Sequence, residues 1–287
     1  MQHIMTNHYE IYYDRRNVVV YSTDRLAFEP KDWQIDLKRD ARNAVEQLCA
    51  ENGEGVLAIY GADNDRGFVD TENALFYNMG TAAFREIARH VLAFNTLSRD
   101  ETNRLLAQVG KPQYHHYYSY QVSRFQHSAK NILLKWDKID LFSMCGERRP
   151  FDYWKLMRER QNEIKVLHDE DFKERFGIEL HFFESGISAI NLANPMKALL
   201  DGIICAFHRM PEGIDRNMLT DVSTRLNLPV EQFLYTSKTI LGEEIFVRPY
   251  RKNVFWNPQD DRCSSVSMSI DYGAERRCFS GCIYKIS

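Results

Sequence analysis

Hydrophobic residues recur along this chain at two spacings, one typical of strands and one typical of helices. Short apolar runs at residues 56–60 and 178–183 are typical of buried strands, and a loop containing glycine follows each of them. From Met196 onward, apolar residues recur at helical spacing, after Asn194, a favoured N-cap, and Pro195, which fits the first helical position. The pattern therefore predicts strand, loop and helix units of the α/β (α+β) class.

The same periodicities predict elements on both sides of these units. Strands are expected at 17–21, 244–247 and 266–270. Helices are expected at 33–52 behind Asp32, at 74–91 with an interruption at Gly80, at 99–109 behind a Ser98 capping box, at 152–172 behind Asp152, and at 217–226 and 230–235. Lys111-Pro112 is the predicted internal boundary, which divides the chain into units 1–110 and 111–287, the second with inserted helices at about 211–240.

Residues 114–120 are crowded with tyrosines and histidines. One interpretation is an aromatic strand that packs on a sheet. The other is a surface on which bases stack, because Arg124, Lys130 and Lys135 follow closely and could contact phosphates. The sequence leaves both open.

Composition narrows the class of protein. With 287 residues, 44% of them hydrophobic and 27% charged, the chain is typical of a globular protein with one large domain or two modest ones. The net charge of −3 gives it no overall attraction to nucleic acid, so such contacts would have to come from local patches. No apolar run approaches the roughly 20 residues of a membrane helix, and residues 1–10 are polar. We therefore expect no membrane partner, a cytoplasmic location and six reduced cysteines.

Two parts of the chain carry the same succession of elements. Helix 33–52 and strand 56–60 precede Asp70-Thr-Glu-Asn73, and helix 152–172 and strand 178–183 precede Asn191-Leu-Ala-Asn194. The offset is constant through the motif, since 191 − 70 = 121 and 194 − 73 = 121. This regularity indicates a tandem duplication.

The motif residues resemble those of the RusA-type Holliday-junction resolvases, small α/β nucleases that work as dimers. That family has Asp-x-Asp-Asn-x-x-Lys at a helix start and an acidic pair before a later strand. In the first copy Asp70, Glu72 and Asn73 match, with glutamate for the second aspartate. The matching residues of the second copy are Asn194, Lys197 and Asp201, followed by Asp260 and Asp261 before the strand at 266–270.

The resemblance implies two tandem resolvase-like units, each a small sheet packed with helices, that form a pseudodimer within one chain. It also implies cleavage of branched or structured DNA that depends on Mg²⁺ or Mn²⁺. The roles carried over are catalysis for Asp70, Glu72 and Lys197, metal binding for Asp70, Glu72, Asp260 and Asp261, and nucleic-acid binding for Asn73, Asn194, Lys197, Arg124 and Lys130.

The departures from the family pattern bear on catalysis. Phe76 falls where the first copy should have its lysine, and Asn191 and Ala193 replace both acids of the second motif. Phosphodiester hydrolysis needs converging carboxylates to hold a metal, and neither copy has a complete set. A composite site is conceivable if the two halves face one another. The other expectation is a degenerate nuclease fold that binds without cutting.

Simpler explanations exist for each of these residues. Glu72 and Asn73 could cap a helix, Lys197 and Asp201 could form a surface ion pair, and Asp260-Asp261 could be turn residues. Cys263, Cys278 and Cys282 lack the paired spacing and the fourth ligand of a zinc site. Three functions remain: a nucleic-acid-binding protein with little or no catalysis, which we favour, a metal-dependent endonuclease, and a non-catalytic factor that binds a protein partner, for example in a phage or mobile-element defence conflict.

Overall fold

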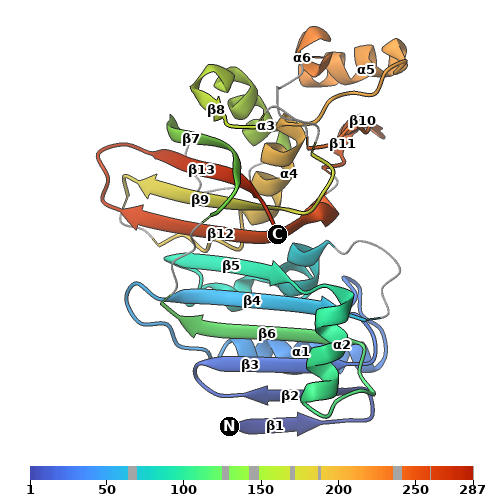
Figure 1. Cartoon of the computed structure of the whole chain (residues 1–287), viewed down its shortest axis with the longest axis vertical. Helices are drawn as coiled ribbons and strands as arrows, with labels where there is room; N and C mark the ends of the chain where they lie inside the picture. The colour runs from blue at the N-terminus through green and yellow to red at the C-terminus, as the bar shows by residue number, and fades with distance from the viewer. Residues whose placement is uncertain are drawn as a thin grey trace.

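A computed structural model of the chain describes residues 1–63, 70–124, 129–141, 149–168, 172–186, 189–234, 241–258 and 260–286. Within these residues, eleven strands form one mixed sheet (Figure 1). In the order in which they pair, its strands are β1 (Gln2–Met5), β2 (Tyr9–Tyr13), β3 (Asn17–Ser22), β6 (His116–Ser123), β4 (Gly55–Ala62), β5 (Val91–Thr96), β12 (Cys263–Tyr272), β9 (Phe176–Glu184), β13 (Cys278–Lys285), β7 (Ile132–Asp140) and β8 (Ile164–Val166).

The sheet has two halves that meet where β5 and β12 pair antiparallel. Outward from β5 lies β4, which is parallel to β5. Next come β6 and then β3, each antiparallel to the strand before it. Outward from β12 lies β9, which is parallel to β12. Next come β13 and then β7, again each antiparallel to the strand before it. The four strands β5, β4, β6 and β3 of one half therefore have the same order and relative directions as β12, β9, β13 and β7 of the other half.

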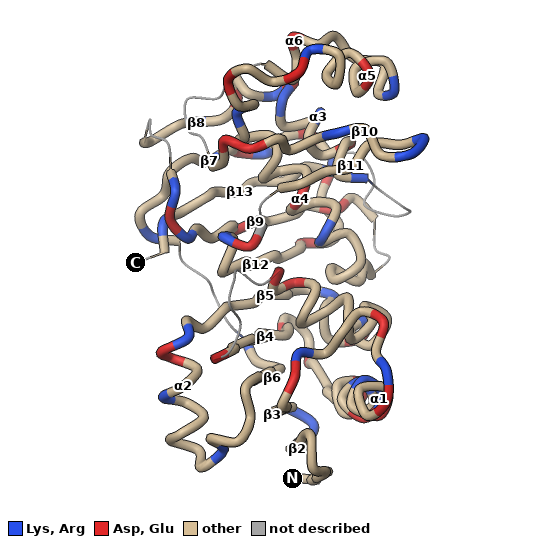
Figure 2. The backbone as a smooth tube through the Cα atoms, turned by 90° about the vertical axis from the view of Figure 1, so that its right-hand side faces the viewer, with Lys and Arg blue, Asp and Glu red and all other residues tan. Residues whose placement is uncertain are grey.

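Helices cover the sheet unequally. The described α-helices are α1 (Trp33–Val45), α2 (Arg99–Gln108), α3 (Pro150–Glu159), α4 (Met196–Ala206), α5 (Arg216–Leu226) and α6 (Glu231–Leu234). Helices α1 and α4 lie on one face of the sheet, and α2 lies on the opposite face of the first half (Figure 2). Helix α4 packs closely on α3, because a Cβ added to Gly202 would come within 2.4 Å of the Pro150 carbonyl oxygen. None of the helices among the described residues is long and apolar enough to cross a membrane.

The main core lies between the sheet and the helices α1, α3 and α4. In the first half, Phe94 of β5 contacts Phe76, with ring centroids 6.3 Å apart. In the second half, Leu199, Leu200 and Ile203 of α4 are buried as the apolar face of that helix requires. Burial of the alternate strand residues on this face explains why the strand at 56–60 and the strand at 178–183 could be recognised as apolar runs.

Several predicted elements are confirmed. Strands β3, β4, β9 and β12 contain the predicted runs, and α5 and α6 lie close to the predicted helices at 217–226 and 230–235. The capping box at α2 is present, since the Ser98 hydroxyl accepts from Glu101 N (3.3 Å) and Ser98 N donates to Glu101 Oε2 (2.7 Å). Helix α4 begins at Met196 with Pro195 as its N-cap, so the prediction that Asn194 caps it was wrong by one residue.

Other helix predictions were wrong. Helix α1 ends at Val45 instead of 52, and Asp32 forms no side-chain cap hydrogen bond. Helix α3 ends at Glu159, because residues further along, predicted as helical, form β8 and pair with β7. The stretch at 74–91 contains a π-helical turn, Asn73–Tyr77, and a 3-10 turn, Thr81–Phe84, before β5 begins at Val91. For the residues of β8, pairing with a distant strand outweighs local helical periodicity.

The C-terminal part shows a shift and an addition. The strand predicted at 244–247 is displaced, since β10 (Val247–Tyr250) pairs with β11 (Asn253–Trp256) in a separate hairpin. Strand β13, which the sequence did not predict, pairs with β9 and β7.

Of the two interpretations of the aromatic segment at 114–120, the structure confirms the strand, because the segment leads into β6. Tyr118 and Tyr120 are buried, and Tyr120 Oη donates to the Leu75 carbonyl (2.7 Å). These rings therefore pack in the core instead of stacking on bases. Because β6 lies between β3 and β4, a division at residues 110 and 111 separates β6 from its paired strands.

Candidate functional site

The first motif follows β4 and begins a turn against the end of β5. Thr71 Oγ1 lies 2.6 Å from Thr96 Oγ1, which ties the motif to that strand. Asp70 Oδ1 accepts from Asn73 N (3.2 Å), the Asp70 carbonyl accepts from Ala74 N (3.1 Å), and Asn73 Nδ2 donates to Asp70 Oδ2. Asp70 therefore caps the turn that follows it, as local turn chemistry would predict.

The second motif docks on the first half of the chain. Asn191 Nδ2 donates to the Thr81 carbonyl (2.9 Å), and Leu192 N donates to the Ala88 carbonyl (2.9 Å). These bonds hold the start of α4 beside the first motif.

Tyr77 joins the two motifs directly. Its hydroxyl donates to the Asn194 carbonyl (3.2 Å) and accepts from Lys197 N (3.1 Å). Burial raises the pKa of Tyr77 to about 12, against the backbone hydrogen bond from Lys197, so the hydroxyl stays protonated at neutral pH. The first turn of α4 is therefore fixed relative to the first motif.

The side chains of the two motifs converge on the Lys197 ammonium. Its Nζ lies 2.9 Å from Glu72 Oε1, 3.2 Å from Asp70 Oδ2 and 3.6 Å from Asp201 Oδ1. The exposed fractions are 2% for the Glu72 side chain, 10% for Asp201 and 30% for both Asp70 and Lys197. Three acids and one lysine from two distant parts of the chain thus form one partly buried group, which we call the Lys197 cluster.

The Lys197 cluster does not present the arrangement that Mg²⁺ needs. Magnesium requires oxygen ligands at about 2.0–2.1 Å in octahedral geometry, and the carboxylates of Asp70, Glu72 and Asp201 here converge on an ammonium nitrogen instead. Among the described residues, no group of three or more histidine, cysteine, aspartate or glutamate side chains could hold a metal ion. Mg²⁺ or Mn²⁺ binding therefore stays a prediction from the resemblance.

The predicted acidic pair lies at the other end of α4. Asp261 is close enough to the Arg262 guanidinium to raise its pKa, although burial lowers that pKa overall. Burial and the nearby Arg262 guanidinium lower the pKa of His208. His208 lies just beyond the C-terminal end of α4, whereas Lys197 lies in the first turn of that helix. Eleven residues of helix correspond to about 16 Å. Asp261 is therefore far from the Lys197 cluster, and the side chain of Asp260 lies outside the description.

The residues predicted to bind nucleic acid do not form one surface. Asn73 bonds to Asp70, and Asn194 is exposed at the start of α4. Arg124 donates to the Asn52 carbonyl (3.3 Å) near the edge where β4 begins. Lys130 precedes β7 at the opposite edge and lines a cavity there.

A further polar group escaped the sequence analysis. His181 Nδ1 lies 2.6 Å from Ser269 Oγ, and His181 Nε2 lies 3.0 Å from Asp271 Oδ2. A serine, a histidine and an aspartate in contact could act as a catalytic group only if nearby N–H groups stabilised an oxyanion. The strands β9 and β12 that carry these residues are paired on both sides, so their backbone N–H groups are used by the sheet and are not available for this. Cross-strand register, which no local motif encodes, brings these residues together.

The described cysteines show no zinc site. Cys263, Cys278 and Cys282 are buried thiols outside any disulfide, and burial raises the pKa of Cys282 to about 12. Because only a thiolate binds zinc well, Cys282 behaves as a packed apolar side chain.

Comparison of the chain with protein-family models, with curated proteins and with solved structures gives no match. The relation to the RusA-type resolvases therefore rests on the motif residues described above.

Proposed function

We propose that the chain is a nucleic-acid-binding protein with a duplicated, partly degenerate RusA-like fold, which binds branched DNA without cleaving it. The observation that carries the proposal is the Lys197 cluster. Asp70 and Glu72 come from the first motif, and Lys197 and Asp201 come from the second. These four residues, through which the chain resembles the resolvases, meet at one place.

The order of the strands supports a duplicated unit. The first motif follows β4 and the second follows β9, and these strands have equivalent places in the two halves of the sheet. Helix α1 connects β3 to β4, and α3 lies on the path from β7 to β9. Two tandem resolvase-like units would produce this correspondence, with the β5 and β12 pairing as the pseudodimer junction.

The charge arrangement favours binding without cleavage. An ammonium group already neutralises the carboxylates that a metal would need, and Glu72 is nearly inaccessible to solvent. The backbone of Lys197 is also fixed beside the first motif, because its N–H donates to Tyr77. The cluster therefore stabilises the junction between the two halves instead of holding a catalytic metal.

The test is incubation of the purified chain with a labelled four-way DNA junction, and with a linear duplex of the same length, in Mg²⁺, in Mn²⁺ and in EDTA. We expect native gels to show a shifted junction under all three conditions, with a shift that weakens steeply as salt increases. Denaturing gels should show intact strands.

Cleavage that requires metal and disappears in Asp70→Asn would overturn the non-catalytic part of the proposal and establish the nuclease alternative. If neither junction nor duplex shifts even at low salt, the nucleic-acid proposal is wrong and the protein-interaction alternative takes its place.

A further inference from the structure

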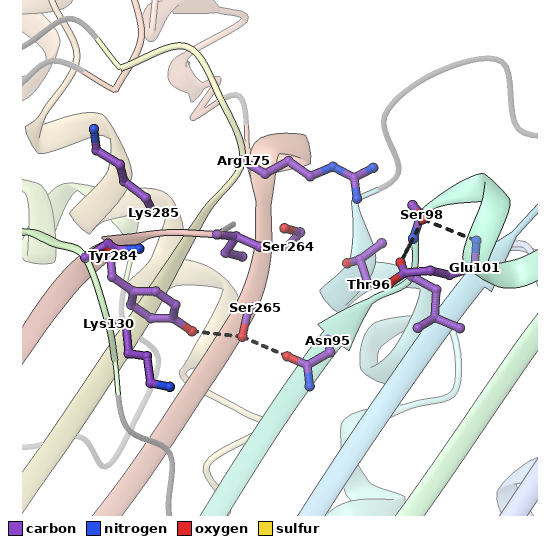
Figure 3. A pocket seen from close by; sticks show the side chains of 13 residues that line it. Asn95, Thr96, Ser98, Glu101, Lys130, Arg175, Ser264, Ser265, Tyr284 and Lys285 are labelled. Carbon is purple, nitrogen blue, oxygen red and sulfur yellow. Dashed lines mark hydrogen bonds between the residues drawn. The ribbon is translucent and has the colours of Figure 1, made fainter.

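A cavity lies at the edge of the sheet where β5 and β13 end and β12 begins. It encloses about 630 Å³, which is within the range of about 300–1,000 Å³ typical of ligand sites (Figure 3). Asn95 in its floor follows Phe94, which packs against Phe76 on the face of the motifs, so Asn95 points to the opposite face. Asn95 is therefore directed away from the Lys197 cluster, whereas its neighbour Thr96, which also lines the cavity, contacts Thr71 of the first motif.

A chain of hydrogen bonds orients the amide of Asn95. Tyr284 Oη donates to Ser265 Oγ (2.9 Å), and Ser265 Oγ donates to Asn95 Oδ1 (2.7 Å). Burial raises the pKa of Tyr284 far above neutral pH, so its hydroxyl remains a donor. With Oδ1 accepting from Ser265, the amide of Asn95, which lines the cavity, keeps its two N–H groups as donors.

Three cations belong to the lining of the cavity. Arg175 reaches over the cavity from the start of β9, and Lys130 enters from the side of β7 (Figure 3). Lys285, which also lines the cavity, directs its ammonium over the Phe172 ring, 5.5 Å from the centroid. Glu101 is the acid in the lining, and its Oε2 accepts from the backbone and hydroxyl of Ser98 (2.7 Å each).

The balance of charge in the lining is the reverse of that in the whole chain. Three cations and one capped carboxylate line the cavity of a protein whose net charge is −3. A local positive potential in a concave site attracts anions, and a guanidinium, an ammonium and an amide are the donors that phosphate oxygens accept from.

We infer that this cavity binds a phosphate group, carried by a mononucleotide or by the 5′ end of a nucleic-acid strand. Arg175 and Lys130 neutralise the phosphate, and the Asn95 amide donates to one of its oxygens. The volume exceeds that of a phosphate alone, so the sugar and base have room beside it. The inference does not depend on the Lys197 cluster that carries the proposed function, because Arg175, Lys130 and Asn95 are not members of it.

Isothermal titration of the full chain tests the site with four probes: inorganic phosphate, AMP, a 5′-phosphorylated hexanucleotide and the same hexanucleotide with a 5′-hydroxyl. We expect the phosphate-bearing probes to bind and the 5′-hydroxyl strand to bind at least about tenfold more weakly, because it lacks the charged group that the donors recognise. Tighter binding of the phosphorylated strand than of AMP assigns the site to strand ends, and equal binding assigns it to nucleotides.

Asn95→Asp is the sharpest variant. It keeps the acceptor for Ser265, removes the two N–H donors and adds a negative charge, so phosphate binding should fall by at least about tenfold with unchanged thermal stability. Arg175→Gln should weaken binding in the same direction. The matched control is Lys155→Gln, which removes an exposed cation on α3 and should leave binding unchanged.

Two results would overturn the inference: the absence of binding by every phosphate-bearing probe at millimolar concentration, or equal binding by Asn95→Asp and the original chain. Binding of the four-way junction is assayed in parallel with the original chain and with the Asn95→Asp variant. A junction shift that persists in a chain without phosphate binding removes this inference and leaves the proposed function intact.

Discussion

Replacement of Lys197 by methionine should destabilise the fold measurably. The variant keeps most of the length and apolar character of the side chain but removes the ammonium that contacts Glu72, Asp70 and Asp201. Three carboxylates would then face one another without a cation, and the most buried of them, Glu72, has only 2% of its side chain exposed.

The magnitude follows from burial. Removal of one partner of a fully buried ion pair costs about 3–5 kcal/mol, because the remaining charge is left uncompensated. Lys197 and Asp70 are each 30% exposed, so solvent screens part of this effect. We therefore expect the free energy of unfolding to fall by about 2–3 kcal/mol.

Urea unfolding at neutral pH measures this loss, which should appear as a lower midpoint with an unchanged slope. Adding Glu72→Gln to the variant should recover part of the loss, since it removes the buried charge.

The control is Lys155→Met, which breaks an exposed ion pair with Glu159 (3.7 Å) and should cost less than about 0.5 kcal/mol. If Lys197→Met loses no more stability than this control, the Lys197 cluster does not hold the two halves together and the reasoning is refuted.

Three further predictions concern the stability of the fold. Burial alone would raise the pKa of Glu10, but hydrogen bonds from Lys111 and two tyrosines hold that pKa at about 2. The ionised Glu10 carboxylate therefore stabilises the fold above the ordinary pKa of glutamate, and this stabilisation is lost as pH falls toward 2. Glu10→Gln should therefore flatten the melting temperature against pH over that acid range, and an unchanged profile would contradict this. Ser98→Ala should cost about 1 kcal/mol by removing the α2 cap, measured by urea unfolding against Ser98→Thr, which retains a hydroxyl. Gly202→Ala should cost about 1–3 kcal/mol, because its Cβ would meet the Pro150 carbonyl, and a stability equal to the original would show that α3 can move away from α4.

Local sequence was sufficient for elements whose signal is strong and short-range. The α2 capping box, the apolar face of α4 and the runs that became β4 and β9 were predicted because each depends on neighbouring residues. The stretch before β5 was misjudged because its apolar residues recur at helical spacing, although it forms only a π-helical turn and a 3-10 turn.

The sequence by itself determined the α/β class, the two motifs with their constant offset, and the acids and lysine within them. Only the tertiary structure decided that Lys197 lies among Asp70, Glu72 and Asp201, because that contact depends on how α4 docks on the first half of the chain. The Asn95 cavity was likewise invisible, since its lining comes from distant parts of the chain that the pairing of β5 with β12 brings together. Periodicity encodes which face of an element is buried, whereas the partners across that face are fixed only when the whole chain packs.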